Sequence, residues 1–304
     1  MTAGPLLPPG VRGRIVRRTV VAPVAARPVT GPSGGSPVTG PGGASPVTRL
    51  AVVEIGPAHA PAWLLAPGAG SSAHVVAGAF AGPVCAAGGR LVTYDLRGHG
   101  ASGPAPDPAD HHLDVVTGDL AAVAAATGGD IEVVGGISLG GHAAVRAVAA
   151  GLLAVRPSAV LACLPAFAEP VPAGHGVHAA IAATAVAHGV EGLLDGARQA
   201  DGLPRWLRTA VLRDQARHDP ASLVAALWAL DGADAPTDAE RRELGLPLGV
   251  VGWPDDPGHP LPVAERWAAS AGRAALVTIT MAALEAGLER LGLAGRDAVA
   301  RAMR

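Results

Sequence analysis

The chain is organised around the stretch Ile131-Glu132-Val133-Val134-Gly135-Gly136-Ile137-Ser138-Leu139-Gly140-Gly141-His142. A β-rich run leads into the pattern Gly-x-Ser-x-Gly, and an alanine-rich run of helical composition follows at residues 143–150. Strand, sharp turn and helix in this order present the central side chain on a strained turn, from which Gly136 and Gly140 keep neighbouring Cβ atoms away. The helix behind the turn aims unpaired N–H groups and a positive dipole end at Ser138. We therefore expect Ser138 to be a nucleophile.

Length and composition predict a globular protein. The 304 residues can bury one large core, or a core and a smaller inserted unit. Hydrophobic residues make up 49% of the chain but aromatic residues only 3%, so Ala, Val and Leu must form most of the core. The net charge of −2 does not favour nucleic acid or an anionic membrane surface as a partner. Cys85 and Cys163 lie in apolar runs, as buried thiols do in a reducing cytosol, which favours a cytoplasmic location.

Residues 1–48 differ in composition from the rest. They contain no acidic residue, are rich in Pro and Gly, and repeat Pro-Val-Thr from Pro28, Pro37 and Pro46. Such a segment cannot bury a core, so we expect a disordered N-terminal arm over residues 1–48 and a folded domain over residues 49–304.

The folded part alternates between strand and helix patterns. Short apolar runs typical of buried strands occur at residues 50–55, 62–66, 90–94, 131–137, 159–164, 247–252 and 274–279, and helical segments separate most of them. This alternation predicts an α/β fold with a mostly parallel sheet covered by helices on both faces. Between about residues 165 and 245, five helical stretches follow one another with no strand between them. An all-helical insert at the carboxyl end of a sheet strand is placed to cover a site, so we interpret it as a cap.

Four loops, in this order, resemble those of the α/β-hydrolase superfamily, in particular its capped esterase and peptidase-like branch. Pro67-Gly68-Ala69-Gly70-Ser71-Ser72 is similar to the oxyanion loop, although the usual His-Gly reads Pro67-Gly68. Asp95-Leu96-Arg97-Gly98-His99-Gly100-Ala101-Ser102 matches the signature Asp-x-Arg-Gly-His-Gly-x-Ser in full. The Gly-x-Ser-x-Gly turn is the third loop, and Asp-Pro-x-x-Pro at residues 256–260 resembles the loop that carries the acid. The resemblance covers about residues 50–304 and implies an α/β-hydrolase fold.

The resemblance also implies roles for single residues. Ser138 would be the nucleophile, and the backbone N–H groups of Leu139 and Ala69 would form the oxyanion hole. Asp256 would be the acid of the catalytic triad. Asp255 is its rival, because the distance from the end of the preceding strand favours Asp255 whereas the following proline favours Asp256. His99 would stabilise its own loop.

The general base is missing from its usual place. The family carries a histidine on the loop after the last strand, but residues 260–304 contain no histidine. Thr280 reads as the N-cap of a helix that begins near Met281, so we expect the loop itself to be replaced. Without a base a serine hydroxyl is a poor nucleophile, and loss of the base typically costs on the order of 10⁶ in turnover.

Another histidine can enter the site in space. His259 lies three residues after Asp256, and His74 follows the oxyanion loop, so these two are the main candidates for a displaced base. Further histidines occur near the Arg-Gly-His-Gly loop and in the cap, at His111, His112, His175, His178, His188 and His218. His142 is expected to pack behind the turn that carries Ser138.

Three alternatives to a displaced histidine base are compatible with the sequence. The pocket could serve a triad-free lyase, isomerase or cyclase of natural-product biosynthesis, it could bind a ligand without catalysis, or a water or an Asp could act as a slow base. We favour a serine-nucleophile acyl hydrolase acting on a small, largely apolar ester or thioester, because the cap and core offer apolar side chains. The sequence contains no metal-ligand spacing of cysteines, so no metal and no organic cofactor is implied. The expected partner is a small-molecule substrate, with neither nucleic acid nor a membrane involved.

Overall fold

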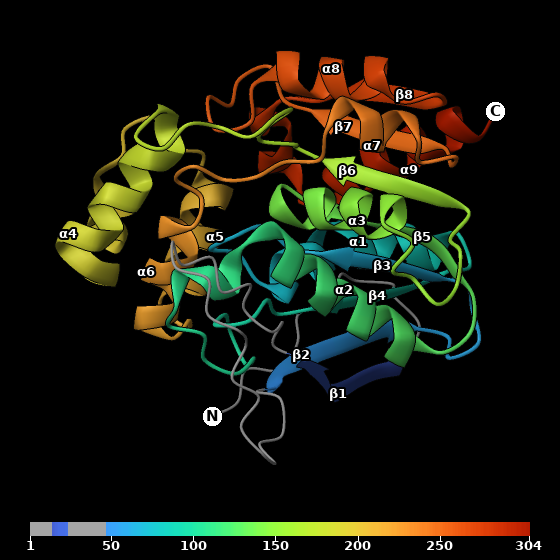
Figure 1. Ribbon diagram of the computed structural model, residues 1–304, viewed down its shortest axis with the longest axis horizontal. Helices are drawn as coiled ribbons and strands as arrows, with labels where there is room; N and C mark the ends of the chain where they lie inside the picture. The colour runs from blue at the N-terminus through green and yellow to red at the C-terminus, as the bar shows by residue number, and fades with distance from the viewer. Residues whose placement is uncertain (1–13, 24–46) are drawn as a thin grey trace, which may run out of the picture.

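The computed structural model describes residues 14–23 and 47–304, and the strands in these ranges form one eight-stranded sheet (Figure 1). The strands are β1 (Arg14–Pro23), β2 (Val47–Gly56), β3 (Ala62–Ala66), β4 (Arg90–Tyr94), β5 (Ile131–Ile137), β6 (Ala159–Cys163), β7 (Leu248–Gly252) and β8 (Ala274–Thr278). Their order in the sheet is β1-β2-β4-β3-β5-β6-β7-β8. The β1–β2 and β2–β4 pairs are antiparallel, and all the others are parallel. The predicted α/β fold with a mostly parallel sheet is confirmed.

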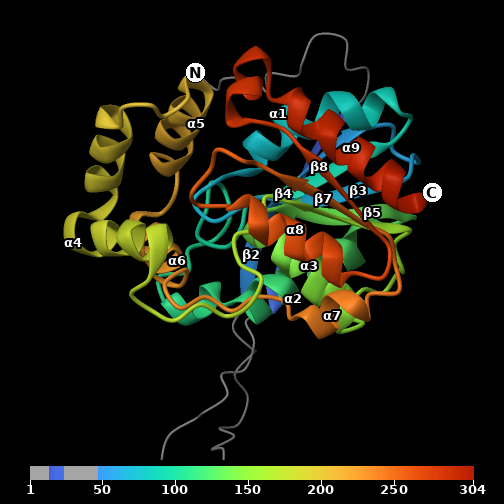
Figure 2. The same cartoon turned by 90° about the horizontal axis from the view of Figure 1, so that it is seen from above.

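Helices cover both faces of the sheet (Figure 2). The helices that pack against it are α1 (Ala73–Ala86), α2 (Leu113–Thr127), α3 (Leu139–Ala149), α8 (Leu261–Ser270) and α9 (Glu289–Met303). α1 and α9 pack together on one face, while α2, α3 and α8 lie on the other. The inner strands β3, β4, β6 and β7 are buried along their whole length, as expected for strands covered on both faces. The hydrophobic clusters on the two faces consist mainly of Ala, Val and Leu.

The N-terminal region differs from the prediction of a continuous disordered arm. Residues 14–23, expected within that arm, form the edge strand β1, which pairs with β2 over its whole length. Arg18 on β1 also forms an ion pair with Glu54 on β2, at 2.7 Å. Five of the ten residues of the strand are β-branched and so favour extended backbone, and its Val20 and Ala22 are buried. The rest of the predicted arm, residues 1–13 and 24–46, lies outside the described residues.

The helical insert lies between β6 and β7. Its helices are α4 (Gly176–Gln199), α5 (Arg205–Gln215), α6 (Pro220–Trp228) and α7 (Asp238–Arg242). The two helices expected at residues 177–188 and 191–200 correspond to the halves of α4, whose backbone leaves helical geometry at Gly189 (φ 62°, ψ −162°). α4, α5 and α6 stand beside the sheet, whereas α7 packs against α3 and α8 (Figures 1 and 2). The predicted all-helical insert is therefore present.

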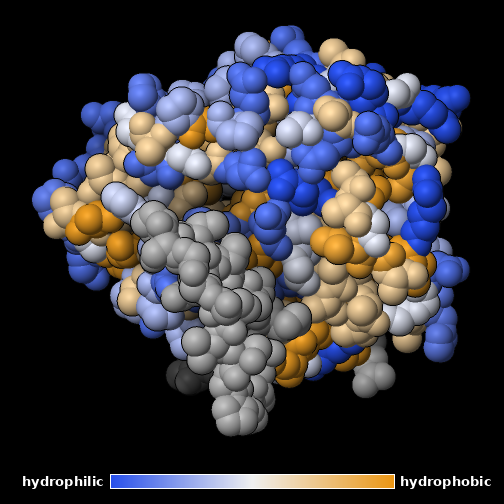
Figure 3. Space-filling model, in the orientation of Figure 1, coloured by the Kyte–Doolittle hydropathy of each residue, from blue (hydrophilic) through white to orange (hydrophobic). Residues whose placement is uncertain are grey.

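α4 is the one helix in the described ranges that is long and apolar enough to cross a membrane. A single helix of this kind is weak evidence for a membrane span, and the break at Gly189 divides it into two shorter segments. Val177, Ile181 and Val186 of α4 are exposed, and apolar side chains lie on the surface over this helix (Figure 3).

The segment after β8 replaces the loop that carries the histidine in the resembled family. Thr280 accepts a hydrogen bond from the Ala283 N–H at 3.2 Å, so it caps the next turn as predicted. That turn is the short 3₁₀ helix η2 (Met281–Ala286), and the last α-helix, α9, begins only at Glu289. The prediction that the last helix begins near Met281 was wrong in this respect. The other 3₁₀ helix of the described residues, η1 (Pro108–His111), precedes α2.

A buried ion pair stabilises the loop after β4. Arg97 donates two hydrogen bonds to the Asp119 carboxylate on α2, at 2.8 and 2.6 Å. Their side chains are only 1% and 0% exposed. Burial raises the pKa of Asp119, and the hydrogen bonds from Arg97 oppose that increase. The arginine of the Arg-Gly-His-Gly motif therefore has a structural role.

We predict that Asp119→Asn lowers the free energy of unfolding by about 3–5 kcal/mol, because it removes the buried counterion of Arg97 and leaves the more distant and more exposed Asp110, at 3.9 Å. Asp297→Asn is the matched control, since it breaks the exposed Arg301–Asp297 pair and should leave the free energy of unfolding nearly unchanged. Urea unfolding of the two variants and the wild type measures both values. Equal losses in the two variants would contradict a special contribution from the buried pair.

Candidate active site

Ser138 occupies a strained turn between β5 and α3. Its backbone has φ 50° and ψ −120°, a conformation that non-glycine residues rarely adopt. A Cβ atom at Gly136 would lie 2.4 Å from the carbonyl oxygen of Ala66, and one at Gly140 would lie 2.3 Å from the same atom. Both positions therefore require glycine, for the steric reason inferred from the Gly-x-Ser-x-Gly pattern.

His259 and Asp256 meet Ser138 at the carboxyl end of the sheet. The His259 Nε2 atom lies 3.0 Å from the Ser138 Oγ atom, and His259 Nδ1 lies 2.6 Å from Asp256 Oδ2. Both side chains come from the loop between β7 and α8, and they are partly buried, with exposures of 21% for His259 and 14% for Asp256. Because the carboxylate accepts from Nδ1–H, the unprotonated Nε2 faces the hydroxyl. This order of hydrogen bonds is the one that a serine nucleophile needs.

The neighbouring Asp255 and Asp256 side chains have different hydrogen-bond partners. Asp256 accepts hydrogen bonds from His259 and from the Gly258 N–H at 2.8 Å. Burial alone would raise the pKa of Asp256, but these hydrogen bonds outweigh it and lower the pKa below its ordinary value. Asp255 instead accepts from the Met281 N–H at 3.0 Å and so helps to fix the start of η2. Only Asp256 therefore contacts the histidine.

The loop of residues 67–72 passes directly beside Ser138. A Cβ atom on Gly68 would lie 3.2 Å from the Ser138 Cβ atom, so the two backbones are in close contact. Ala69 follows Gly68 in this loop, and Leu139 is the first residue of α3, where a backbone N–H has no acceptor within its own helix. The role of Ala69 and Leu139 as oxyanion donors stays a prediction that this proximity supports.

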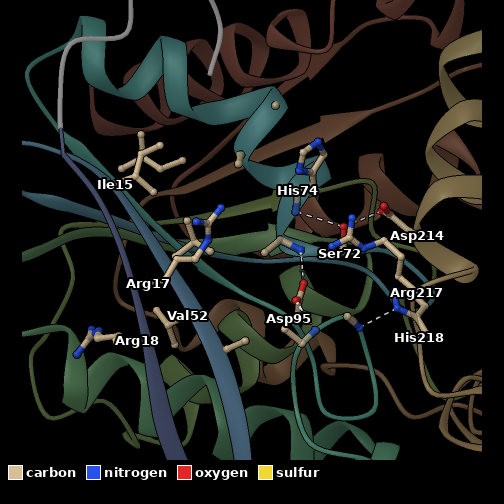
Figure 4. A pocket seen from close by; sticks show the side chains of 18 of the residues that line it. Ile15, Arg17, Arg18, Val52, Ser72, His74, Asp95, Asp214, Arg217 and His218 are labelled. Atoms are coloured by element: carbon tan, nitrogen blue, oxygen red, sulfur yellow. Dashed lines mark hydrogen bonds between the residues drawn. The ribbon is translucent and has the colours of Figure 1, made fainter. Parts of the chain in front are cut away.

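His74, the other candidate base, faces a different part of the molecule. It lines a cavity of ≈ 450 Å³ together with Ser72 and Asp214, and neither Ser138 nor His259 is among the lining residues (Figure 4). Burial lowers the pKa of His74. Of the two histidines proposed from the sequence, the structure brings only His259 to Ser138.

Two further histidines, His178 and His142, lie near His259. The rings of His178, on α4, and His259 are 6.0 Å apart and perpendicular, and burial followed by the nearby His259 lowers the pKa of His178 to about 4. His142 packs behind the strained turn, as expected, and its Nε2 accepts the Ala166 N–H at 3.2 Å. Burial, with a smaller contribution from His259, lowers the pKa of His142 to about 3. The proximity of His178 was not predicted, because it depends on how the insert folds back.

No metal site accompanies this arrangement in the part of the chain that the structure describes. Within residues 14–23 and 47–304, no group of three or more His, Cys, Asp and Glu side chains is placed to hold a metal ion.

A strained serine turn at the end of a central parallel strand, beside an Asp–His pair, defines an α/β protein of the nucleophile-elbow type. The chain belongs to the alpha/beta hydrolase family, whose model matches residues 63–287. No curated protein matches the chain in sequence.

Solved structures agree on the fold. A thermophilic esterase from Thermogutta terrifontis is 19% identical, with a TM-score of 0.63 over 93% of this chain and 96% of the other. The enol-lactonase from Burkholderia xenovorans LB400 is 22% identical, with a TM-score of 0.61 over 76% of this chain and 88% of the lactonase. The bottromycin epimerase BotH is 24% identical, with a TM-score of 0.59 over 83% of this chain and 94% of BotH. At these identities the likeness shows the fold alone.

The buried neutral state of His142 predicts a pH-dependent stability. Its folded pKa of about 3 lies below the ordinary value of about 6.5, so between these values the unfolded chain binds a proton that the folded chain does not. The free energy of unfolding should therefore fall with decreasing pH, by up to about 1.4 kcal/mol per unit from this residue. His142→Gln, measured by urea unfolding between pH 6 and 4, should reduce that slope. An unchanged slope would contradict the assignment.

Proposed function

We propose that this protein is a serine acyl hydrolase in which His259, on the loop after β7, replaces the histidine expected after β8. The observation that carries the proposal is the hydrogen-bonded series from Ser138 Oγ through His259 to Asp256, at 3.0 and 2.6 Å. A hydrolase-type function is in line with the family of the chain. The serine nucleophile, its base and its substrate are proposals.

The proposed reaction follows from the order of these groups. His259 Nε2 takes the hydroxyl proton while Ser138 Oγ attacks the carbonyl carbon, and the resulting oxyanion accepts hydrogen bonds from the Ala69 and Leu139 N–H groups. Asp256 keeps Nδ1 protonated and stabilises the imidazolium. The imidazolium then gives the proton to the leaving alcohol or thiol, which departs with the electron pair of its bond to the carbonyl. A water molecule, deprotonated by His259, hydrolyses the acyl-enzyme by the same steps.

The local sequence supports a base on the loop after β7. Pro254, Pro257 and Pro260 restrict the backbone of this loop, which lowers the entropy lost on holding His259 next to Ser138. The place of the usual histidine loop is taken by η2, whose N-terminus is capped by Thr280 and bonded by Asp255.

A cavity at the junction of the insert and the core offers space for a small molecule, although neither Ser138 nor His259 is among its lining residues. It measures ≈ 280 Å³ and reaches Leu139, the residue after the proposed nucleophile. Leu113, Trp228 and Leu230 contribute apolar walls, at the junction of α2 with the end of α6. This volume lies near the lower limit for small-molecule pockets, which are usually about 300–1,000 Å³. We propose that the insert acts as a cap and that the substrate is a small ester or thioester, without metal or organic cofactor.

We also propose a cytoplasmic location. Cys85 and Cys163 are both free thiols, and Cys163 is fully buried. Burial raises the pKa of Cys163 well above its ordinary value, so this thiol stays protonated and unreactive, which suits a reducing compartment.

A triad-free reaction is the second candidate function. It is favoured by the similarity to BotH, a structure described as an epimerase. In that case Ser138 would be a polar group of the pocket, and its removal would leave much of the activity.

We predict that a serine-reactive fluorophosphonate labels the wild type once, and that Ser138→Ala and His259→Ala are not labelled. Loss of the base should lower ester turnover on the order of 10⁶-fold, and Asp256→Asn should lower it about 10⁴-fold, because the imidazole loses its correct tautomer. Intact mass and turnover of a short-chain ester measure these effects.

Asp255→Asn is the matched control, because it alters the adjacent carboxylate that bonds Met281 rather than His259. It should be labelled like the wild type and lose only about 1 kcal/mol of stability as a weakened cap. Labelling of His259→Ala at the wild-type rate would refute His259 as base. A folded wild type that resists labelling would favour the triad-free alternative.

A further inference from the structure

Two neighbouring imidazole rings bond the backbone N–H and carbonyl of Gly70 in the loop of residues 67–72. His99 Nε2 accepts the Gly70 N–H at 2.9 Å, while its Nδ1–H donates to the Arg97 carbonyl at 2.8 Å. His218 Nε2–H donates to the Gly70 carbonyl at 3.2 Å, while its Nδ1 accepts the Gly100 N–H at 2.9 Å. The rings are 4.5 Å apart. Figure 4 shows His218 among the residues that line the cavity of ≈ 450 Å³.

This pattern requires both rings to be neutral. Each ring has one nitrogen facing an N–H group and the other facing a carbonyl, so a second proton would place two donors against each other. Burial, followed by the nearby His218, lowers the pKa of His99 to about 3, and burial lowers the pKa of His218. The charged and titratable groups that face His218 are His99, Asp95, Asp214 and Arg217.

Gly70 occupies a position on which its neighbour Ala69 depends. The Ser71 N–H bonds to the Gly68 carbonyl at 3.1 Å, so Ala69 and Gly70 form the centre of a tight turn. Gly70 has φ 72°, as the third residue of a type II turn does. A shift of Gly70 would therefore change the backbone angles of Ala69 and the direction of the Ala69 N–H.

The two histidines come from different parts of the protein. His99 belongs to the core loop after β4, but His218 lies between α5 and α6 in the insert and is only 5% exposed. Other buried polar groups dock the insert nearby. Asp214 accepts from Ser72 Oγ at 2.8 Å, and Ser222 Oγ accepts the Ala105 N–H at 2.8 Å. His218 differs from these anchors because it bonds the backbone of the residue that follows Ala69.

We infer that His218 is a positioning residue, through which the helical insert sets the direction of the oxyanion donor at Ala69. The inference rests on the proposed function, since it assigns to the Ala69 N–H a role in stabilising the oxyanion. His218 touches neither the substrate nor the reacting atoms. Its effect passes through the Gly70 carbonyl, so the insert contributes to the arrangement of the hole as well as to the covering of the site.

The test compares His218→Ala with Ser222→Ala, a control that removes another buried hydrogen bond between insert and core. Loss of one oxyanion donor typically costs about 10²–10³ in kcat, so misdirection of one should cost about 10- to 100-fold. His218→Ala should show this loss in kcat with KM changed less than about threefold. Ser222→Ala should lower the melting temperature by a similar amount and keep kcat within about twofold. Equal kcat values in the two variants would overturn the inference.

Conservative variants separate positioning from packing. The side-chain amide of Gln can replace the Nε2 donor that reaches the Gly70 carbonyl, whereas that of Asn can replace only the Nδ1 acceptor that reaches Gly100. His218→Gln should therefore restore more of the lost kcat than His218→Asn. Equal rescue by both, or better rescue by Asn, would indicate a packing role and refute the inference.

An NMR measurement that does not depend on activity tests the positioning role of His218 separately from the proposed hydrolase function. Imidazole ¹⁵N shifts of the wild type should show the Nε2–H tautomer of His218, and exchange of the Gly70 amide hydrogen should be at least about tenfold faster in His218→Ala than in Ser222→Ala. If the wild type resists fluorophosphonate, the proposed function fails, and these NMR data still decide whether His218 holds the loop. An Nδ1–H tautomer, or unchanged exchange, would refute the inference.

Discussion

The close approach of two backbones beneath Ser138 is the constraint on which the other parts of the site depend. Gly136 and Gly140 both lie against the carbonyl of Ala66, at the end of the neighbouring strand β3. This contact joins the strained turn to the loop that begins at Pro67. Leu164, at the end of β6, is the other non-glycine residue with positive φ in the described chain, at 57°. Strain at adjacent strand ends is typical of functional sites.

Buried polar contacts hold the insert to this edge of the sheet. Asp214, His218 and Ser222 are each at most 5% exposed, and each bonds a loop of the core. A buried polar group without a partner costs about 1–3 kcal/mol, so these contacts specify one docking position more sharply than apolar packing alone would. By contrast, apolar side chains of α4 meet solvent at Val177, Ile181 and Val186.

The fold was predictable because local signals and tertiary structure agree. The strands at residues 62–66 and 90–94 were predicted with their observed bounds, since each is a short buried apolar run. β1 was missed because the composition of residues 1–48 as a whole concealed a strand whose order comes from pairing with β2. His259 was one of several candidate bases, because sequence spacing does not show how a loop folds back on Ser138. The choice between Asp255 and Asp256 was likewise a matter of side-chain direction.

In this chain the Asp–His pair shares one loop. Asp256 and His259 are three residues apart and bonded directly, with the His259 N–H also bonded to the Asp256 carbonyl at 3.3 Å. In the arrangement that the family resemblance implied, acid and base sit on separate loops, so small movements of two strands alter both distances. Here both groups belong to one loop, so the distance between acid and base does not depend on the relative position of two strands. The segment beyond β8 therefore supports the site through the contact between the Met281 N–H and Asp255 rather than through a histidine of its own.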